Sequence, residues 1–256
     1  MKLKIKMMIA GSLVVLLAGI ESGLGSRGTD SQSGLPEGEF HMARLIYRTR
    51  GGGGSHGIVQ PWWAIDYPYA EEHFLPALRR MTNLSVADDS RHLEITDDRI
   101  FQYPFLFMQQ PGRGFWNPSE VEAERMREYL LRGGFLLVDD LHGPYDWAVF
   151  EASMLRVMPD YSIVDIPEED EIMNIFFDLD QSVQIPGLRH VRRLEMAGPA
   201  RWRGIYDEKG RLMVAINFNM DMGDAWEHAD DPYYPVPMTK LAYQLGINYV
   251  IYAMTH

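Results

Sequence analysis

Residues 133–143 read Gly-Gly-Phe-Leu-Leu-Val-Asp-Asp-Leu-His-Gly, and this stretch decides the expected fold. The two glycines are typical of a helix end. The apolar run Phe135–Val138 is typical of a strand buried on both faces. Asp139, Asp140 and His142 follow the run at once, at the strand end where open α/β sheets bind ligands. The stretch therefore predicts a central strand with a candidate site at its carboxyl end.

The elements on either side of this strand alternate between strand and helix. Asn117 is expected to cap the preceding helix, with Pro118 at its first position and Glu120 in its first turn. Strands are expected in 40–50, 101–108, 161–166 and 188–196, helices in 69–81, 145–158 and 238–254, and a hairpin in 202–218. This order predicts an α/β fold, an open mostly parallel sheet with helices on both faces and a late β-hairpin.

The N-terminal residues carry the pattern of an export signal. Lys2, Lys4 and Lys6 precede the apolar run Met7–Ile20, and small residues follow. The run is shorter than the about 20 apolar residues of a spanning helix. We expect a signal peptide over 1–26, a flexible linker over 27–39 and a single α/β domain over 40–256. The protein is then periplasmic or extracytoplasmic, without a membrane span in the mature chain; a retained anchor is the alternative.

Composition narrows the classes of function. The chain of 256 residues has a formal net charge of −12 and contains no cysteine. The negative charge argues against nucleic acid as a partner. The lack of cysteine excludes disulfides and thiolate chemistry. Cationic partners and metal ions fit the charge better, although acidity also serves solubility alone.

Candidate ligand-binding residues follow the expected strands. Asp66 and Trp63 lie after the first strand, and Trp63 belongs to a set of tryptophans that would form either a stacking surface or part of the core. Glycines 51–54 are expected to form a mobile loop, with backbone N–H groups that could approach an anion. The remaining candidates are Arg48, Arg50, Asp139, Asp140, His142, Asn219, Asp221, Asp224, Trp226 and Glu227.

A divalent metal is the candidate cofactor, because carboxylate and imidazole groups are its usual ligands. The candidate ligands are Asp139, Asp140, His142, Asp221 and His228. The acidic stretch 221–231 lacks the ordered spacing of a calcium loop and of a zinc-protease helix, so a solvated acidic loop is the alternative. Successive strand residues point to opposite faces, so Asp139 and Asp140 need not share one site.

Four short motifs resemble a bacterial family, the domain of unknown function family 4159. They are Asp66-Tyr67-Pro68, Gly133-Gly134-Phe135 running to Asp139-Asp140, the segment 219–227, and the tail 245–253. The resemblance implies a fold similar to class I glutamine amidotransferases, which is flavodoxin-like, and no established activity. It also implies partners among envelope or membrane-complex proteins.

In amidotransferase-like folds a cysteine nucleophile sits on a tight turn after a central strand. The comparable turn here, 139–143, has acids and no thiol, so glutamine hydrolysis by that route is excluded. Two functions lead: a domain that binds a ligand or partner in the envelope, and a metal-dependent hydrolase of carbohydrate or cell-wall material; a purely structural subunit with a large exposed apolar patch is a third option. The first predicts that the candidate side chains lie apart or bond to the scaffold. The second predicts carboxylate and imidazole groups within about 5 Å of a common point.

Overall fold

The strand β6 (Phe135–Leu141) lies in the middle of a seven-stranded sheet, and every one of its residues is buried. A computed structural model describes residues 38–49, 51–55, 57–113, 115–179, 184–194 and 198–256. The predictions for residues 1–26 and for most of 27–39 fall outside these ranges. Phe135 and Leu137 pack into the core on one face of the sheet, and Leu136 and Val138 into the core on the other. This division explains the continuous apolar run, because a strand covered on both faces has no polar side.

The sheet has the order β4-β1-β5-β6-β9-β8-β7. The first five strands in this order are parallel, whereas β8 is antiparallel to β9 and to β7. The predicted mostly parallel sheet with a late hairpin is therefore confirmed. The strands are β1 (Ala43–Ile46), β4 (Arg91–Glu94), β5 (Phe105–Gln109), β7 (Val164–Asp165), β8 (Arg201–Tyr206) and β9 (Leu212–Phe218).

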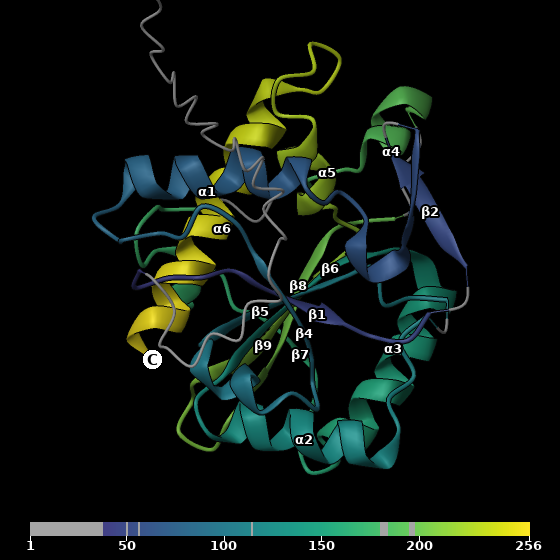
Figure 1. Cartoon of the computed structure of the whole chain (residues 1–256), viewed down its shortest axis with the longest axis vertical. Helices are drawn as coiled ribbons and strands as arrows, with labels where there is room; N and C mark the ends of the chain where they lie inside the picture. The colour runs from purple at the N-terminus through teal and green to yellow at the C-terminus, as the bar shows by residue number, and fades with distance from the viewer. Residues whose placement is uncertain (1–37, 50, 56, 114, 180–183, 195–197) are drawn as a thin grey trace, which may run out of the picture. The chain divides into compact units, whose positions relative to one another are not determined.

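Helices cover both faces of the sheet, as predicted, and Figure 1 shows α1 and α6 on one side and α2 and α3 on the other. Phe74 of α1 and Leu245 of α6 belong to one core, whereas Met126 of α2 and Phe150 of α3 belong to the other. The α-helices are α1 (Tyr69–Met81), α2 (Glu120–Leu131), α3 (Gly143–Val157), α4 (Leu188–Arg193), α5 (Met222–Glu227) and α6 (Val236–Thr255), and the 3-10 helices are η1 (Trp62–Ala64), η2 (Asp98–Gln102) and η3 (Glu171–Met173).

Several predicted boundaries are wrong. Helix α2 is capped by Ser119, whose side chain exchanges hydrogen bonds with Glu122 in a capping box, two residues later than the predicted cap Asn117. Residues 98–102 form η2, so the strand predicted over 101–108 begins at Phe105. The glycines at 52–54 belong to β2 (Gly52–Ser55), which pairs antiparallel with β3 (Ile58–Pro61), rather than to a free loop.

Two larger errors affect the segments that form the site. Residues 188–193 form the helix α4, where a β segment was predicted over 188–196; residues 195–197 are outside the described ranges. Met222–Glu227 forms α5, where an acidic loop was the alternative. Both helices are only one to two turns long. So few turns give a sequence pattern too short to separate a helical from an extended period.

A buried ion pair fixes the segment after β1. The Arg44 and Glu71 side chains are almost completely buried, and Nη2 of Arg44 lies 2.8 Å from Oε1 of Glu71. Nη1 of Arg44 also donates hydrogen bonds to the carbonyl oxygens of Trp63 and Ile65. A guanidinium can make these contacts together because its donors form a rigid planar fork. The pair thereby holds η1 against the sheet. It also sets the position of Asp66, the residue that follows Ile65.

Candidate functional site

A cavity of about 510 Å³ lies at the carboxyl ends of the parallel strands. Its lining includes Trp62 from the segment after β1, Gln110 after β5, Asp140 and His142 at the end of β6, and Asp221 after β9. The predicted meeting of these loops at one edge of the sheet is therefore found in the structure.

The topology explains why a crevice forms at this edge. The chain leaves β1 toward α1 on one face of the sheet and leaves β5 toward α2 on the other face. Neighbouring strands whose connections diverge in this way leave a crevice beyond their carboxyl ends. The hydroxyl of Tyr47 lies 2.6 Å from the carbonyl oxygen of Gln109 and 2.9 Å from that of Gln110, which ties the end of β1 to the end of β5.

Asp139 holds the start of α5 in place. Its Oδ2 accepts hydrogen bonds from the backbone N–H groups of Met222 (2.7 Å) and Gly223 (2.9 Å), and its Oδ1 accepts one from the amide of Asn217 (3.2 Å). The Tyr249 hydroxyl in turn donates to Oδ1 of Asn217 at 2.7 Å. Asp139 is fully buried, so its oxygens serve the scaffold and face away from solvent.

Asp140 points into the cavity because the strand is irregular at this residue. The register between β6 and β9 shifts between Val138 and Leu141, and Asp140 has a left-handed backbone with φ 54°. A bulge of this kind redirects a side chain next to a site. Oδ1 of Asp140 lies 3.0 Å from Nε2 of His142. The two adjacent acids therefore have separate roles, Asp139 in the scaffold and Asp140 in the cavity.

Two groups of potential metal ligands meet at Asp221. Asp140, His142 and Asp221 each place one ligand atom within 4.8 Å of the others, and so do Asp66, Asp221 and Asp224. Metal–ligand bonds are about 2.0 to 2.5 Å long, so side chains that share an ion lie within about 5 Å of each other. We call the five residues Asp66, Asp140, His142, Asp221 and Asp224 the rim cluster.

One carboxylate oxygen of Asp66 accepts no hydrogen bond from the described residues. Its Oδ2 accepts a hydrogen bond from Nε2 of Gln109, whereas its Oδ1, although buried, has no hydrogen-bond partner among the described residues. Only 1% of Asp66 is exposed. A Cβ at position 223 would lie 2.2 Å from Oδ2 of Asp66, so only glycine lets α5 approach this carboxylate so closely. A buried oxygen without a donor costs free energy, which a bound cation would recover.

Backbone strain is concentrated at the same edge. Left-handed φ angles occur at Asp66 (68°), Gln110 (48°), Asp140 (54°) and Asn219 (60°). Such a conformation costs an L-residue of order 1 kcal/mol, and it persists where the surroundings fix it. Oδ1 of Asn219 accepts a hydrogen bond from the N–H of Gly143 at 2.9 Å, which joins the end of β9 to the start of α3. Asn219 therefore helps to fix the segments that border the cavity.

Burial and the repulsion of neighbouring carboxylates raise the pKa values of three carboxyl groups in the rim cluster, those of Asp66, Asp221 and Asp224. Burial raises the pKa of Asp221, and the charges of Asp140, Asp224 and Asp66 add to the shift. Burial also raises the pKa of Asp66 and of Asp224, with further contributions from neighbouring carboxylates. Burial acts to lower the pKa of His142, but the nearby carboxylates, Asp140 first, outweigh it and the pKa is raised. The cluster thus favours positive charge, whether as protons or as a cation.

The metal-free protein is expected to lose stability as the pH rises from about 6.5 to 8. Acids with raised pKa values keep protons in the folded state that the unfolded chain releases above about pH 4. His142, with its raised pKa, stabilises the fold below about pH 6.5 and loses this contribution above its folded pKa. We expect the melting temperature to fall by about 5 °C or more over this range in EDTA, measured by scanning calorimetry. The lowered pKa values of Asp97 and Asp207 act below this range. Burial lowers the pKa of His92 to about 4, and its opposite effect on stability ends at about pH 6.5. A melting temperature that is constant or rises would contradict the prediction.

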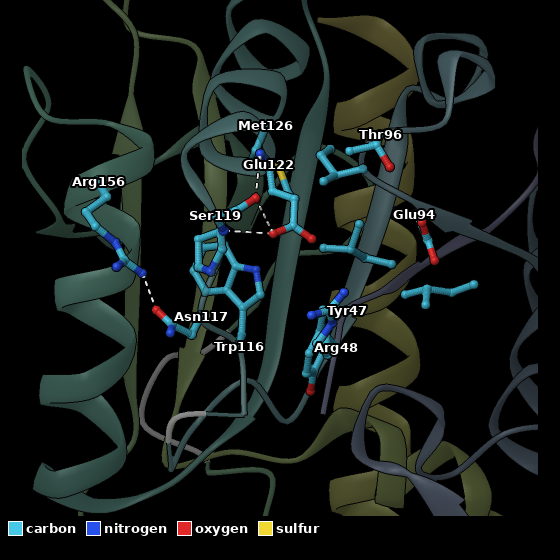
Figure 2. A pocket seen from close by; sticks show the side chains of 14 residues that line it. Tyr47, Arg48, Glu94, Thr96, Trp116, Asn117, Ser119, Glu122, Met126 and Arg156 are labelled. Atoms are coloured by element: carbon cyan, nitrogen blue, oxygen red, sulfur yellow. Dashed lines mark hydrogen bonds between the residues drawn. The ribbon is translucent and has the colours of Figure 1, made fainter. Parts of the chain in front are cut away.

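Other candidates lie outside the rim cluster. Arg48 lines a second cavity of about 550 Å³ at the start of α2, where Figure 2 shows Ser119 bonded to Glu122 and Arg156 to Asn117. Four polar side chains of this second cavity are thus bonded to one another in two pairs. Arg50 lies outside the described residues.

The tryptophan candidates and the candidates Glu227 and His228 also lie outside the rim cluster. Trp226 is completely buried and stacks on Phe74 with ring centroids 4.2 Å apart, so it belongs to the core. Trp63 contacts His92 edge to face, and its neighbour Trp62 is the tryptophan that lines the cavity. Glu227 and His228 form a further potential ligand group with Asp224 at the end of α5.

Several residues of the cavity were not predicted. Arg113, Arg189, His190 and Arg193 line it, and the ring centroids of His190 and His142 are 4.6 Å apart. Arg189, His190 and Arg193 were missed because a strand was predicted over 188–196. On a helix, residues 189, 190 and 193 lie on neighbouring positions of one side, and this spacing would have brought them together.

Comparison with protein families identifies the chain. Residues 41–254 match the model of a domain of unknown function, DUF4159. The chain belongs to this family. The DUF4159 match covers the whole sheet and every residue of the rim cluster. No curated protein matches the chain. Within the matched residues, Asn248 bonds to the backbone of Ile172 and Phe177, and Tyr249 completes the network of Asp139.

Proposed function

We propose that this DUF4159 domain binds a divalent cation at the rim cluster and that it is a cation-dependent ligand-binding protein. The observation that carries the proposal is the meeting of Asp140, His142 and Asp221 beside a cavity of about 510 Å³. The unpartnered Oδ1 of Asp66 supports it independently. Carboxylate and imidazole ligands together suit Mn²⁺ or Zn²⁺.

We further propose that the fold is of the flavodoxin-like type found in class I glutamine amidotransferases. The five parallel strands lie in the order 2-1-3-4-5 when they are counted along the chain, which is the flavodoxin order. The turn after β6 carries Asp140 and His142, and the chain has no cysteine. A thiolate mechanism is therefore excluded, and a cation replaces it as the functional centre.

The proposed setting is the bacterial envelope, after export by the N-terminal signal. The basic residues and the apolar run over 1–20 support export, and partners would be envelope or membrane-complex proteins. Within the described residues, every helix is too short or too polar to span a bilayer.

The second candidate function is a metal-dependent hydrolase of carbohydrate or cell-wall material. The 3.0 Å contact between Asp140 and His142 favours it, because a carboxylate that orients an imidazole is a common general-base arrangement. Trp62 in the lining provides an aromatic face for a sugar ring. Release of reducing ends from purified peptidoglycan in the presence of Mn²⁺ would favour the hydrolase, and a cation-loaded protein without this activity would favour binding alone.

The proposal is tested by titration of the purified protein with Mn²⁺ in a calorimeter. We expect one or more sites in the wild type, and an affinity at least about tenfold weaker in Asp140→Ala. Because alanine tolerates the left-handed backbone poorly, Asp140→Asn is the companion variant: it keeps the shape and removes the charge. The control Asp88→Ala removes an exposed carboxylate that pairs with Arg79, and it should bind Mn²⁺ as the wild type does. A wild type that binds no Mn²⁺ or Zn²⁺ would refute the proposal. If the Asp140 variants only lower the melting temperature, Asp140 is structural.

A further inference from the structure

The cavity lined by Asp140, His142, Asp221 and Asp224 of the rim cluster is also lined by arginines. Arg113, Arg189 and Arg193 line it, although the chain as a whole has a net charge of −12. Arginines beside buried carboxylates commonly neutralise them in ion pairs. Here no ion pair within 4.0 Å joins any of these three side chains to a carboxylate of the rim cluster in the described part of the chain. Within the described residues, the arginines and the carboxylates of the lining therefore do not neutralise each other in direct ion pairs.

Arg113 is held in position by a tight turn that packs against Asp146. Its Nε lies 3.6 Å from Oδ2 of Asp146 in the first turn of α3, and its own backbone is left-handed, with φ 55°. Gly112 lets the turn approach Asp146, because a Cβ at that position would lie 2.8 Å from the carboxylate. Just over half of the Arg113 side chain is exposed, so the guanidinium remains accessible from the cavity.

Arg189 and Arg193 are one helical turn apart on α4. His190, between them, places its ring against that of His142, which brings this side of α4 to the rim cluster. Figure 1 shows α4 beside β2, whose glycines 53 and 54 line the same cavity. Neither Arg189 nor Arg193 has an ion-pair partner within the described ranges, whereas Arg192 lies 3.7 Å from Asp231 and outside the lining.

We propose that the ligand of this cavity is a small molecule with a phosphate group, bound between the cation of the rim cluster and the guanidinium groups of Arg113, Arg189 and Arg193. This inference rests on the proposed cation site. Guanidinium forks match the oxygens of a phosphate, and its two negative charges suit several arginines together with a cation. A cavity of about 510 Å³ has the size of a small-molecule site.

The test uses phenyl phosphate and, as its carboxylate counterpart, benzoate. Each is titrated into the full-length protein with Mn²⁺ at a saturating concentration. We expect phenyl phosphate to bind at least about tenfold more tightly than benzoate, since it carries an additional charge and oxygen for the arginines. In Arg189→Ala/Arg193→Ala its affinity should fall at least about tenfold, with Mn²⁺ affinity equal or higher. Arg192→Ala, the same change on the same helix but outside the lining, should remain within about twofold of the wild type.

The outcomes separate this inference from the proposed function. If Mn²⁺ binds but phenyl phosphate does not, or if benzoate binds equally well, the phosphate inference is overturned and the cation site stands. If Arg192→Ala loses as much affinity as the double variant, binding reflects overall charge and the inference is also overturned. If phenyl phosphate binds through Arg189 and Arg193 without any Mn²⁺ site, the cation proposal is overturned, and of this inference only the contacts of the arginines with the phosphate stand.

Discussion

Replacement of Asp139 by alanine is expected to lower the free energy of unfolding by about 3 to 5 kcal/mol. The carboxylate is completely buried and accepts hydrogen bonds from two backbone N–H groups of α5 and from Asn217. Alanine leaves these donors buried without an acceptor, at a cost of about 1 to 3 kcal/mol each in general. Urea unfolding followed by circular dichroism measures the loss.

Asp139→Asn is the companion variant for this position. Burial raises the pKa of Asp139 to about 7, so a neutral side chain of the same shape resembles a form that the protein already populates. Asparagine keeps one acceptor oxygen, and we expect a loss of less than about half that of alanine. If Asp139→Ala remained within about 0.5 kcal/mol of the wild type, the network from Tyr249 through Asn217 to α5 would not stabilise the fold as described.

Replacement of Asp221 by asparagine is expected to weaken Mn²⁺ binding by about 100-fold or more. Asp221 is the one residue that belongs to both ligand groups of the rim cluster. Even residues that only orient metal ligands change affinity by about 10 to 100-fold, so a shared ligand should reach the upper end of this range. Calorimetric titration of wild type and variant measures the change.

The same substitution should leave the metal-free protein equally stable or more stable. The pKa of Asp221 is raised by burial and by Asp140, Asp224 and Asp66, so removal of its charge relieves repulsion. Asparagine also retains the side-chain oxygen that caps α5. The control Asp230→Asn changes an exposed acid nine residues further along the chain and should alter neither property. Loss of stability together with unchanged Mn²⁺ affinity would mean that Asp221 is only a helix cap.

The centre of the sheet could be predicted because the sequence pattern of β6 is clear, whereas the edge strand β4 was not predicted. The apolar run after Gly133 and Gly134 lies between two longer amphipathic helices. In that position it predicts a strand that is covered on both faces. The hairpin of β8 and β9 was equally clear, since a turn separates two apolar segments. The acids after these strands could be assigned to one edge because parallel strands end together.

The separate roles of the residues within the site could not be predicted from the sequence. Asp139 and Asp140 are neighbours of the same type, and only the bulge at the end of β6 sends one to the scaffold and the other to the cavity. The arginines of α4 were missed because a six-residue helix has too few turns for its period to be recognised. Asp66 depends on the buried Arg44–Glu71 pair, which joins residues 27 positions apart.

The central claim is that the rim cluster holds a divalent cation, and anomalous diffraction from crystals grown with Mn²⁺ tests it most directly. We predict a peak about 2.0 to 2.4 Å from oxygens of Asp140 and Asp221 and from a ring nitrogen of His142. Crystals without an anomalous peak at these side chains, or with the metal only at Asp224, Glu227 and His228, would contradict the account.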